Sequence, residues 1–350
     1  MDDRNFRDRD FLSTEEGFMF CVVGPYHPAD RVISYLKYSP NQAGDWRRGE
    51  DRFKRVMRVY TISNLLETFD LLRNKAPQYL YYSTTYDVEL TAVPRENVVT
   101  HFKPEEKLVG LIEGDQLDSL QGKVVDFVSL LSRLSGVPIS AFGVTGSVLL
   151  DIHTPSFSDM DVTVYGVANS FAVKRALTEL RWGSESNIKR FNEEKLAEWA
   201  ASKMQNHPLN LAEAMRIYKR KWNMGTFDRT FFSVHPVKLE GELAEEYGDK
   251  MFIPDGVVTI CAVVDDDRDS IFLPATYKVR EVKMEEELQT RIEEVVTYEG
   301  IYDSLATKGE VIEARGKLEH VIDRVANKMY DRVLVGSLEG KGREFIKPRD

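Results

Sequence analysis

Asp159 and Asp161, two aspartates set one residue apart, are the residues of this chain whose types and spacing best suit metal chemistry. They open the stretch Asp-Met-Asp-Val-Thr-Val. Its period-two alternation predicts a β-strand with both carboxylates on one face and apolar side chains on the other. Two neighbouring carboxylates repel each other unless a cation lies between them. Hard oxygen ligands favour Mg²⁺ or Mn²⁺, so we expect a divalent metal at this strand.

A Gly-Ser turn, Gly146 and Ser147, precedes the two acids in the sequence. Glycine allows a close backbone approach to a bound group, and a serine hydroxyl can donate to a phosphate oxygen. The turn leads into a short helix predicted at 148–152, whose first N–H groups favour an anion. Ser158, directly before the first acid, is a further candidate contact. Turn, helix, loop and strand together predict a site for a metal-bound nucleoside triphosphate.

The Gly-Ser turn followed by Asp-x-Asp resembles the signature of the nucleotidyltransferase superfamily typified by DNA polymerase beta, and Gly146, Ser147, Asp159 and Asp161 match it. Other stretches are similar to an archaeal family of predicted nucleotidyltransferases. They are Arg-Asp-Arg-Asp-Phe near residue 7, Tyr35-Leu36-Lys37-Tyr38, residues 143–147, Lys221-Trp222-Asn223 and residues 232–236. The resemblance spans most of the chain. It implies an α+β fold with a mixed-sheet nucleotidyltransferase core and metal-dependent transfer of a nucleotidyl group, but no particular acceptor.

The resemblance also implies a third carboxylate on a later neighbouring strand, and here the sequence departs from the pattern. The best later strand, 230–237, contains no acid. Asp228 lies just before it and Glu242 just after it, so these two are candidates for the third catalytic carboxylate. His235, on the strand itself, is a candidate general base or ligand, with a packed, hydrogen-bonded histidine as its alternative.

The leading hypothesis is an enzyme, a Mg²⁺- or Mn²⁺-dependent nucleotidyltransferase. An acceptor hydroxyl would attack the α-phosphorus of a nucleoside triphosphate and release pyrophosphate. The rival hypothesis is a non-catalytic nucleotide- or RNA-binding protein that retains the fold, and the missing strand acid supports it. A third interpretation is a coincidental turn with solvated acids.

Basic and aromatic side chains interleave at the end of a helix predicted to begin near Leu209. The candidate nucleic-acid contacts there are Arg216, Tyr218, Lys219, Arg220 and Lys221. Cations can hold phosphates while an aromatic ring stacks on a base; the alternative is a solvated helix end that suits the macrodipole. Residues 46–48 and 52–55 form a second candidate patch, diluted by Glu50 and Asp51. An RNA end is therefore a candidate acceptor, beside a protein hydroxyl or a small molecule.

Composition bounds the remaining possibilities. The chain has 350 residues and 40.2 kDa, enough for two or three domains. Its net charge of −10 argues against wholesale coating of nucleic acid. No apolar run approaches the roughly 20 residues that span a bilayer, and the charged amino terminus is unlike a secretory signal, so we expect a cytoplasmic protein with no membrane contact. Cys21 and Cys261 have no spacing that suggests zinc or a redox pair.

The pattern along the chain predicts three consecutive domains: an N-terminal α/β region (1–105), a nucleotidyltransferase-like domain (106–248) and a β-rich domain (249–350). Helices are expected at 62–72, 118–135, 169–182 and 193–204. Short strands are expected at 257–264, 270–273, 277–281, 291–296, 311–322 and 332–336. They suggest a small barrel or sandwich, and residues 309–319 loosely resemble a strand pair of an oligonucleotide-binding barrel.

Overall fold

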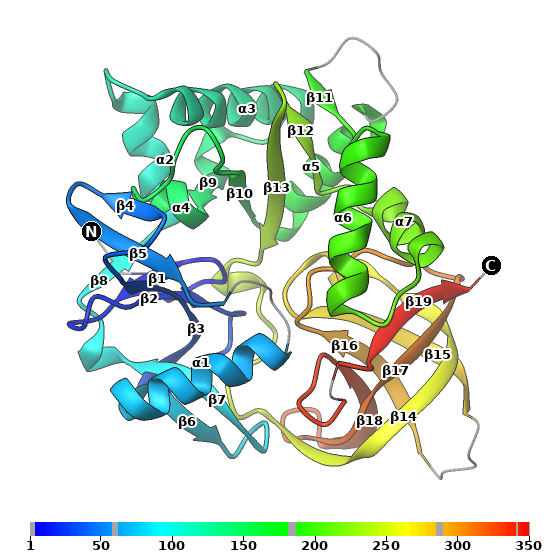
Figure 1. Cartoon of the computed structure of the whole chain (residues 1–350). Coiled ribbons are helices and arrows are strands. Elements are labelled where there is room, and N and C mark those ends of the chain that lie inside the picture. Colours follow the sequence, from blue (N-terminus) through cyan, green and yellow to red (C-terminus); the bar gives the residue numbers. More distant parts are fainter. Residues whose placement is uncertain (1–3, 58–61, 181–186, 285–289, 341, 350) are drawn as a thin grey trace. The chain divides into compact units, whose positions relative to one another are not determined.

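The computed structural model describes residues 4–57, 62–180, 187–284, 290–340 and 342–349 (Figure 1). Its fold is α+β, as predicted. The chain forms two compact units, and each is assembled from three segments. The first unit comprises Met1–Met57, Ala92–Phe191 and Trp222–Ala244, and the second comprises Arg58–Thr91, Asn192–Lys221 and Glu245–Asp350. The units do not coincide with the predicted boundaries at 105 and 248, because segments distant in sequence share one unit.

A five-stranded mixed sheet forms the centre of the first unit. Its strands, in spatial order, are β11 (Ile188–Lys189), β12 (Met224–Phe227), β13 (Thr230–Val237), β10 (Met160–Tyr165) and β9 (Phe142–Thr145). β10 runs parallel to β13 and antiparallel to β9. Two of these strands, β10 and β13, lie where the sequence predicts them. Met160, Val162 and Val164 are fully buried, so the apolar face of β10 is also as expected.

Helices cover this sheet, and local sequence explains where the longest one begins and ends. The helices are α2 (Pro104–Glu113), α3 (Ser119–Ser135), α4 (Gly146–Leu149) and α5 (Val167–Leu180), with 3₁₀ turns at Arg95–Asn97, Ile139–Ala141 and Glu240–Glu242. Asp118 and Gln121 form a capping box at the start of α3, and Gly136 ends it in the left-handed conformation. On its buried face Phe127 packs 4.5 Å from the ring of Phe232 in β13. This helix therefore supports the strand beside the aspartates.

Two predicted helices of this unit differ at their ends. The short helix expected at 148–152 is α4, which begins two residues earlier and stops before Asp151, whose φ of 55° leaves the helical region. The helix expected at 169–182 is α5, which begins two residues earlier, at Val167. Residues 181 and 182 lie outside the described ranges.

The N-terminal segment supplies most strands of a second sheet in the first unit. Its strands are β4 (Trp46–Arg48), β5 (Asp51–Arg55), β3 (Arg31–Pro40), β2 (Met19–Val22), β1 (Phe11–Ser13) and β8 (Thr100–Phe102), in that order. β3 also pairs with residues 92–94 of β7 (Val88–Pro94). Buried apolar side chains along β1, β2 and β3 hold the sheet together.

The second unit contains a closed barrel of five strands. They are β14 (Lys250–Asp266), β15 (Ala275–Met284), β16 (Ile292–Thr297), β18 (Lys328–Val335) and β17 (Val311–Asp323). β17 pairs back to β14, and β16 runs parallel to β18. Oligonucleotide-binding domains are also five-stranded barrels, and the expected likeness to them stays a prediction. Buried residues including Tyr277, Val295 and Val333 form its core.

Further elements complete the second unit. They are α1 (Ile62–Lys75), a 3₁₀ turn at Pro77–Tyr79, the hairpin of β6 (Leu80–Ser83) with residues 88–91 of β7, α6 (Glu193–Asn206), α7 (Leu211–Arg220), a 3₁₀ turn at Arg268–Ile271, and β19 (Phe345–Arg349). Nowhere in the described ranges is a helix long and apolar enough to cross a membrane.

In the barrel region one predicted strand is wrong and one strand was not predicted. No strand forms at 270–273: Ser270 and Ile271 belong to the 3₁₀ turn, because Ser270 N–H donates to the carbonyl of Asp267 and Phe272 N–H to that of Asp269. The strand β19 was not among the predicted strands. Proline is tolerated there because β19 lies at the sheet edge and pairs only with β17 among the described strands.

Candidate functional site

The Gly-Ser turn meets the second aspartate where β9 passes into α4. Thr145 at the end of β9 pairs with Asp161 of β10, so Gly146 follows directly beside that carboxylate. Gly146 has φ of 69°, and a Cβ atom at this position would lie 2.5 Å from Asp161 Oδ2. No side chain fits at such a distance, so only glycine lets the backbone come this close. The structure therefore brings the two halves of the predicted motif together.

The neighbouring strand holds Asp161 in its ionised form. Ser233, the register partner of Asp161 on β13, donates its hydroxyl to Oδ1 at 2.5 Å. His235 Nε2 lies 3.7 Å from the same oxygen. Burial raises the pKa of Asp161, but its interactions with His235, Lys37 and Ser233 lower the pKa by more, to well below its usual range. Its side chain is 29% exposed, so the carboxylate remains accessible to a ligand.

Ser233 and His235 occupy the place on β13 where a third carboxylate would face Asp161. His235 Nε2 lies 2.7 Å from Ser233 Oγ. The serine hydroxyl has one proton, so when it donates to Asp161 the imidazole must donate to the serine. Burial and the charge of Arg9 hold the pKa of His235 below its ordinary value of 6.5. A neutral imidazole with its hydrogen on Nε2 satisfies this arrangement at neutral pH.

The N-terminal segment supplies charged groups that were not predicted as site residues. Thr145 Oγ1 donates to the carbonyl of Arg9 at 2.6 Å, which fixes this segment beside the Gly-Ser turn. Asp8 is buried, accepts from Gly24 N–H at 2.9 Å and lies 3.3 Å from Arg9 Nε. Burial raises the pKa of Asp8. The Arg-Asp-Arg-Asp-Phe stretch was the available signal, but nothing in the sequence placed it near β13.

The remaining residues of the predicted triphosphate site lie in the loop around α4 and β10. Asp159 precedes β10 and is exposed. Ser147 is half-buried, and its carbonyl accepts from Ile152 N–H at 3.1 Å. Ser158 is buried, and its hydroxyl accepts from Thr154 N–H at 2.9 Å. Ser158 therefore stabilises the loop that carries Asp159, and its hydroxyl is already engaged.

The structure does not bring Asp228 or Glu242 to Asp161. Asp228 lies in the turn between β12 and β13, five residues before Ser233. Glu242 lies beyond the other end of β13, where its carboxylate accepts from Val167 N–H at 2.8 Å and Leu239 N–H at 2.9 Å. Neither residue is positioned as a third ligand. The acids nearest to β13 in sequence lie at its two ends. The register, however, puts the middle of β13 opposite Asp161.

Much of the predicted nucleic-acid patch at the end of α7 is engaged within the second unit. Tyr218 is buried and packs 5.5 Å from Trp199. Arg220 pairs with Glu310 at 2.8 Å. Lys221 is fully enclosed and bonds to the carbonyls of Gly300 and Asp303, each at 2.7 Å. Within the predicted patch, Arg216 and Lys219 are the two exposed residues.

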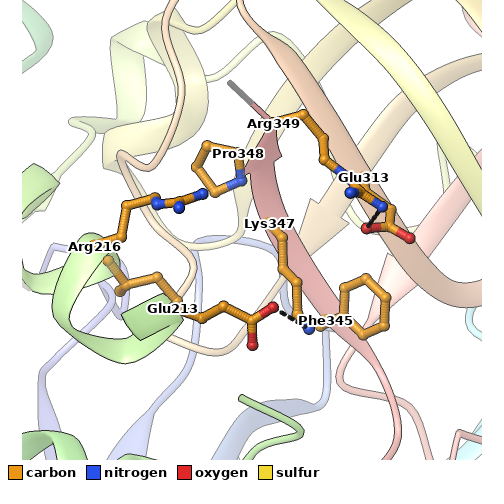
Figure 2. A pocket seen from close by; sticks show the side chains of 8 residues that line it. Glu213, Arg216, Glu313, Phe345, Lys347, Pro348 and Arg349 are labelled. Atoms are coloured by element: carbon orange, nitrogen blue, oxygen red, sulfur yellow. Dashed lines mark ion pairs between the residues drawn. The ribbon is translucent and has the colours of Figure 1, made fainter. Parts of the chain in front are cut away.

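Arg216 lines a pocket of the second unit with a volume of about 260 Å³. Figure 2 shows its lining from α7, β17 and β19. Glu213 pairs with Lys347 at 2.9 Å, and Glu313 with Arg349 at 2.6 Å. The carboxylates that face this pocket are thus paired with cations. None of the residues predicted to bind triphosphate lines it.

Comparison with known proteins gives one full-length relative. The chain is 31% identical over 344 residues to an uncharacterized protein, MJ1086, of Methanocaldococcus jannaschii, and the match covers 97% of this chain and 98% of the relative. No protein-family model matches the chain. No solved structure matches it either.

Proposed function

This chain belongs to the same family as MJ1086, and we propose that it is a metal-dependent nucleotidyltransferase. It would transfer a nucleoside monophosphate from a nucleoside triphosphate to an acceptor hydroxyl and release pyrophosphate. The relative is uncharacterized, so the proposal depends on the site. The observation that carries it is the contact between Gly146 and Asp161, where the Gly-Ser backbone reaches an ionised carboxylate and leaves no room for a side chain.

The donor set fits Mg²⁺ or Mn²⁺ that arrives with a nucleotide. Asp161 is ionised and accessible, and Asp159 is exposed two residues earlier. The described residues contain no group of three or more His, Cys, Asp or Glu able to hold a metal. Mg²⁺ is commonly bound by one or two carboxylates together with substrate phosphates. The metal, when bound, would neutralise charge on the triphosphate and lower the pKa of the attacking hydroxyl.

The protein groups around Asp161 have separate tasks in this proposal. Gly146 lets the backbone approach a phosphate, and the Ser147 hydroxyl donates to it. Ser233 and His235 keep Asp161 ionised and fix its orientation. His235 is therefore a positioning residue, not the third ligand.

One observation favours the alternative, a non-catalytic nucleotide- or RNA-binding protein. The residue that faces Asp161 from β13 is Ser233, where the active nucleotidyltransferase pattern has a carboxylate. Such a protein would bind a metal–nucleotide complex at the same residues without turnover.

The test is incubation of the purified chain with each α-labelled nucleoside triphosphate, Mg²⁺ or Mn²⁺, and an extract of RNA and protein. We expect label on a macromolecule with the wild type and none with Asp161→Asn. The matched control is Asp151→Asn, an exposed turn aspartate with φ of 55° that asparagine tolerates. Metal-dependent nucleotide binding without any transfer would select the non-catalytic alternative. Transfer by Asp161→Asn at the wild-type level would refute both the proposed active site and the non-catalytic alternative.

A further inference from the structure

The β4–β5 hairpin of the first unit borders the loop that leads into the two aspartates. The backbone N–H of Arg47 donates to the carbonyl of Ile152 at 3.4 Å. The rings of Trp46 and Phe157 meet edge to face with centroids 6.2 Å apart. Phe157 lies two residues before Asp159, and Figure 1 shows β4 next to α4. A ligand on this hairpin would therefore lie next to the proposed triphosphate site.

Phe157 is an exposed aromatic ring that packs against the half-buried ring of Trp46. Phe157 is 53% exposed. Trp46 contacts it at one end and packs 5.5 Å from Tyr38 at the other, and Tyr38 is buried in the sheet. A supported ring loses little freedom when a base stacks on it, so the exposed face suits a nucleobase.

Two arginines of the same hairpin lie directly opposite each other. Arg47 on β4 pairs in register with Arg52 on β5, and both are exposed. Like charges at such positions destabilise a strand pair. Arg52 donates to the carbonyl of Gly44 at 3.5 Å, and no ion pair joins either arginine to another described residue. Residues 46–55 carry five cations and two acids in a chain whose net charge is −10. A bound polyanion would relieve this local repulsion.

We propose that this hairpin, together with Phe157, binds the end of a single-stranded nucleic acid that is the acceptor of the transfer. Arg47 and Arg52 contact phosphates, and Phe157 stacks on a base. The acceptor role rests on the proposed function, whereas the binding does not. In the transfer, the terminal hydroxyl oxygen bonds to the α-phosphorus and the α–β bridging bond breaks. Pyrophosphate leaves with the electron pair, and the hydroxyl proton passes to solvent.

Fluorescence anisotropy with a labelled single-stranded RNA of about ten nucleotides tests the binding on the full chain without metal or nucleotide. We expect Phe157→Ala to weaken binding about tenfold and Phe157→Tyr to restore it. The double variant Arg47→Gln, Arg52→Gln should make the slope of log binding constant against log salt concentration less steep by about 1.4. This corresponds to about 0.7 for each lost phosphate contact. Matched controls are Tyr82→Ala, whose ring is 56% exposed elsewhere, and Arg133→Gln, an exposed arginine at the end of α3. Both should bind as the wild type does.

Three results would overturn the inference: no binding of the single strand, equal binding by the hairpin variants, or a duplex that binds as tightly as the single strand. The Asp161→Asn variant separates this inference from the proposed function. RNA binding that survives this change but accompanies no transfer by the wild type would leave the surface in place and refute the enzyme. Transfer to RNA at the wild-type rate by the hairpin variants, or transfer only to protein, would support the enzyme and refute the hairpin as the acceptor site.

Discussion

Asp161 in the first unit and Lys221 in the second are both charged groups in well-packed surroundings, but their hydrogen bonding differs. The Lys221 side chain is 0% exposed, and its ammonium bonds to two carbonyls and lies 2.7 Å from the carboxylate of Asp303. An ammonium has three donors, so nothing is left for a ligand. Asp161 is 29% exposed, with Oδ1 bonded to Ser233 and Oδ2 beside the Gly146 backbone. Its remaining lone pairs can bind a cation, so Lys221 stabilises the fold whereas Asp161 suits chemistry.

The same contrast separates the two basic patches that the sequence suggested. Arg220 bonds to Glu310 and to the carbonyl of Leu305 within the second unit. Arg47 and Arg52 are exposed and face each other across a hairpin. Both patches interleave cations with aromatic residues, so composition alone does not distinguish them. The decisive property is whether the fold already supplies the counter-charge.

Removal of the charge at Lys221 and at Asp161 should give the largest difference between these two residues. Lys221→Met leaves Asp303 and two carbonyls without their donor, and we expect a loss of about 3 kcal/mol or more in the free energy of unfolding. Asp161→Asn keeps the shape and the contact with Ser233 but loses the charge that its neighbours stabilise, so the loss should be smaller than for Lys221→Met. Denaturant unfolding of both variants measures this. A mild effect at Lys221 would mean that its ammonium is not structural.

A methyl group added at Gly146 tests whether nucleotide binding requires the close contact between the Gly146 backbone and Asp161. Gly146→Ala adds a Cβ 2.5 Å from Asp161 Oδ2 at a φ of 69°, and we expect about 1–3 kcal/mol of destabilisation together with loss of nucleotide binding. Gly110→Ala is the matched control, because nothing lies within 4 Å of its added Cβ and it is exposed inside α2. It should raise stability by up to about 1 kcal/mol. Calorimetric melting and nucleotide titration measure both, and unchanged binding by Gly146→Ala would contradict the assignment.

The sequence predicted the parts of the site that depend on local pattern. Alternating residues predicted β10 and β13, and Gly146 and Asp161 meet as the motif requires. Apolar residues at helical spacing and Gly136 likewise predicted the limits of α3. These features are determined within a few residues of the chain, so they can be inferred without tertiary information.

What the sequence did not predict depends on strand register and on segments far apart. The place opposite Asp161 belongs to Ser233, because β10 and β13 pair in a register that no local pattern specifies. Because the register was unknown, Asp228 and Glu242 were predicted as candidates for the third carboxylate. Asp8 and Arg9 reach the site through the contact of Arg9 with Thr145, more than 130 residues later in the chain. The interleaved units have the same cause, since long-range pairing sets them.

Two histidines, one beside Asp161 and one on the barrel, should titrate on opposite sides of the ordinary pKa of 6.5. Hydrogen bonding to Asp331, at 2.6 Å, and then to Asp255 raises the pKa of His320, although partial burial opposes this. Burial and Arg9 lower the pKa of His235, although Asp161 and Asp8 oppose this. NMR titration of the imidazole Hε1 signals should therefore give a midpoint above 6.5 for His320 and below 6.5 for His235, with His320→Gln and His235→Gln to assign them.

The two shifts have opposite consequences for stability. The raised pKa of His320 contributes stability that is fully present below pH 6.5 and is lost as the pH rises through its folded-state value. The lowered pKa of His235 acts in the reverse sense, because below pH 6.5 the unfolded chain binds a proton that the folded chain resists. His320→Gln should thus be destabilising mainly in acid, whereas His235→Gln should remove part of the acid sensitivity of the wild type. Unfolding at pH 5 and pH 8 measures both. A His235 midpoint well above pH 7 would mean that the imidazole beside Asp161 is charged at neutral pH and unable to act as the neutral donor described above.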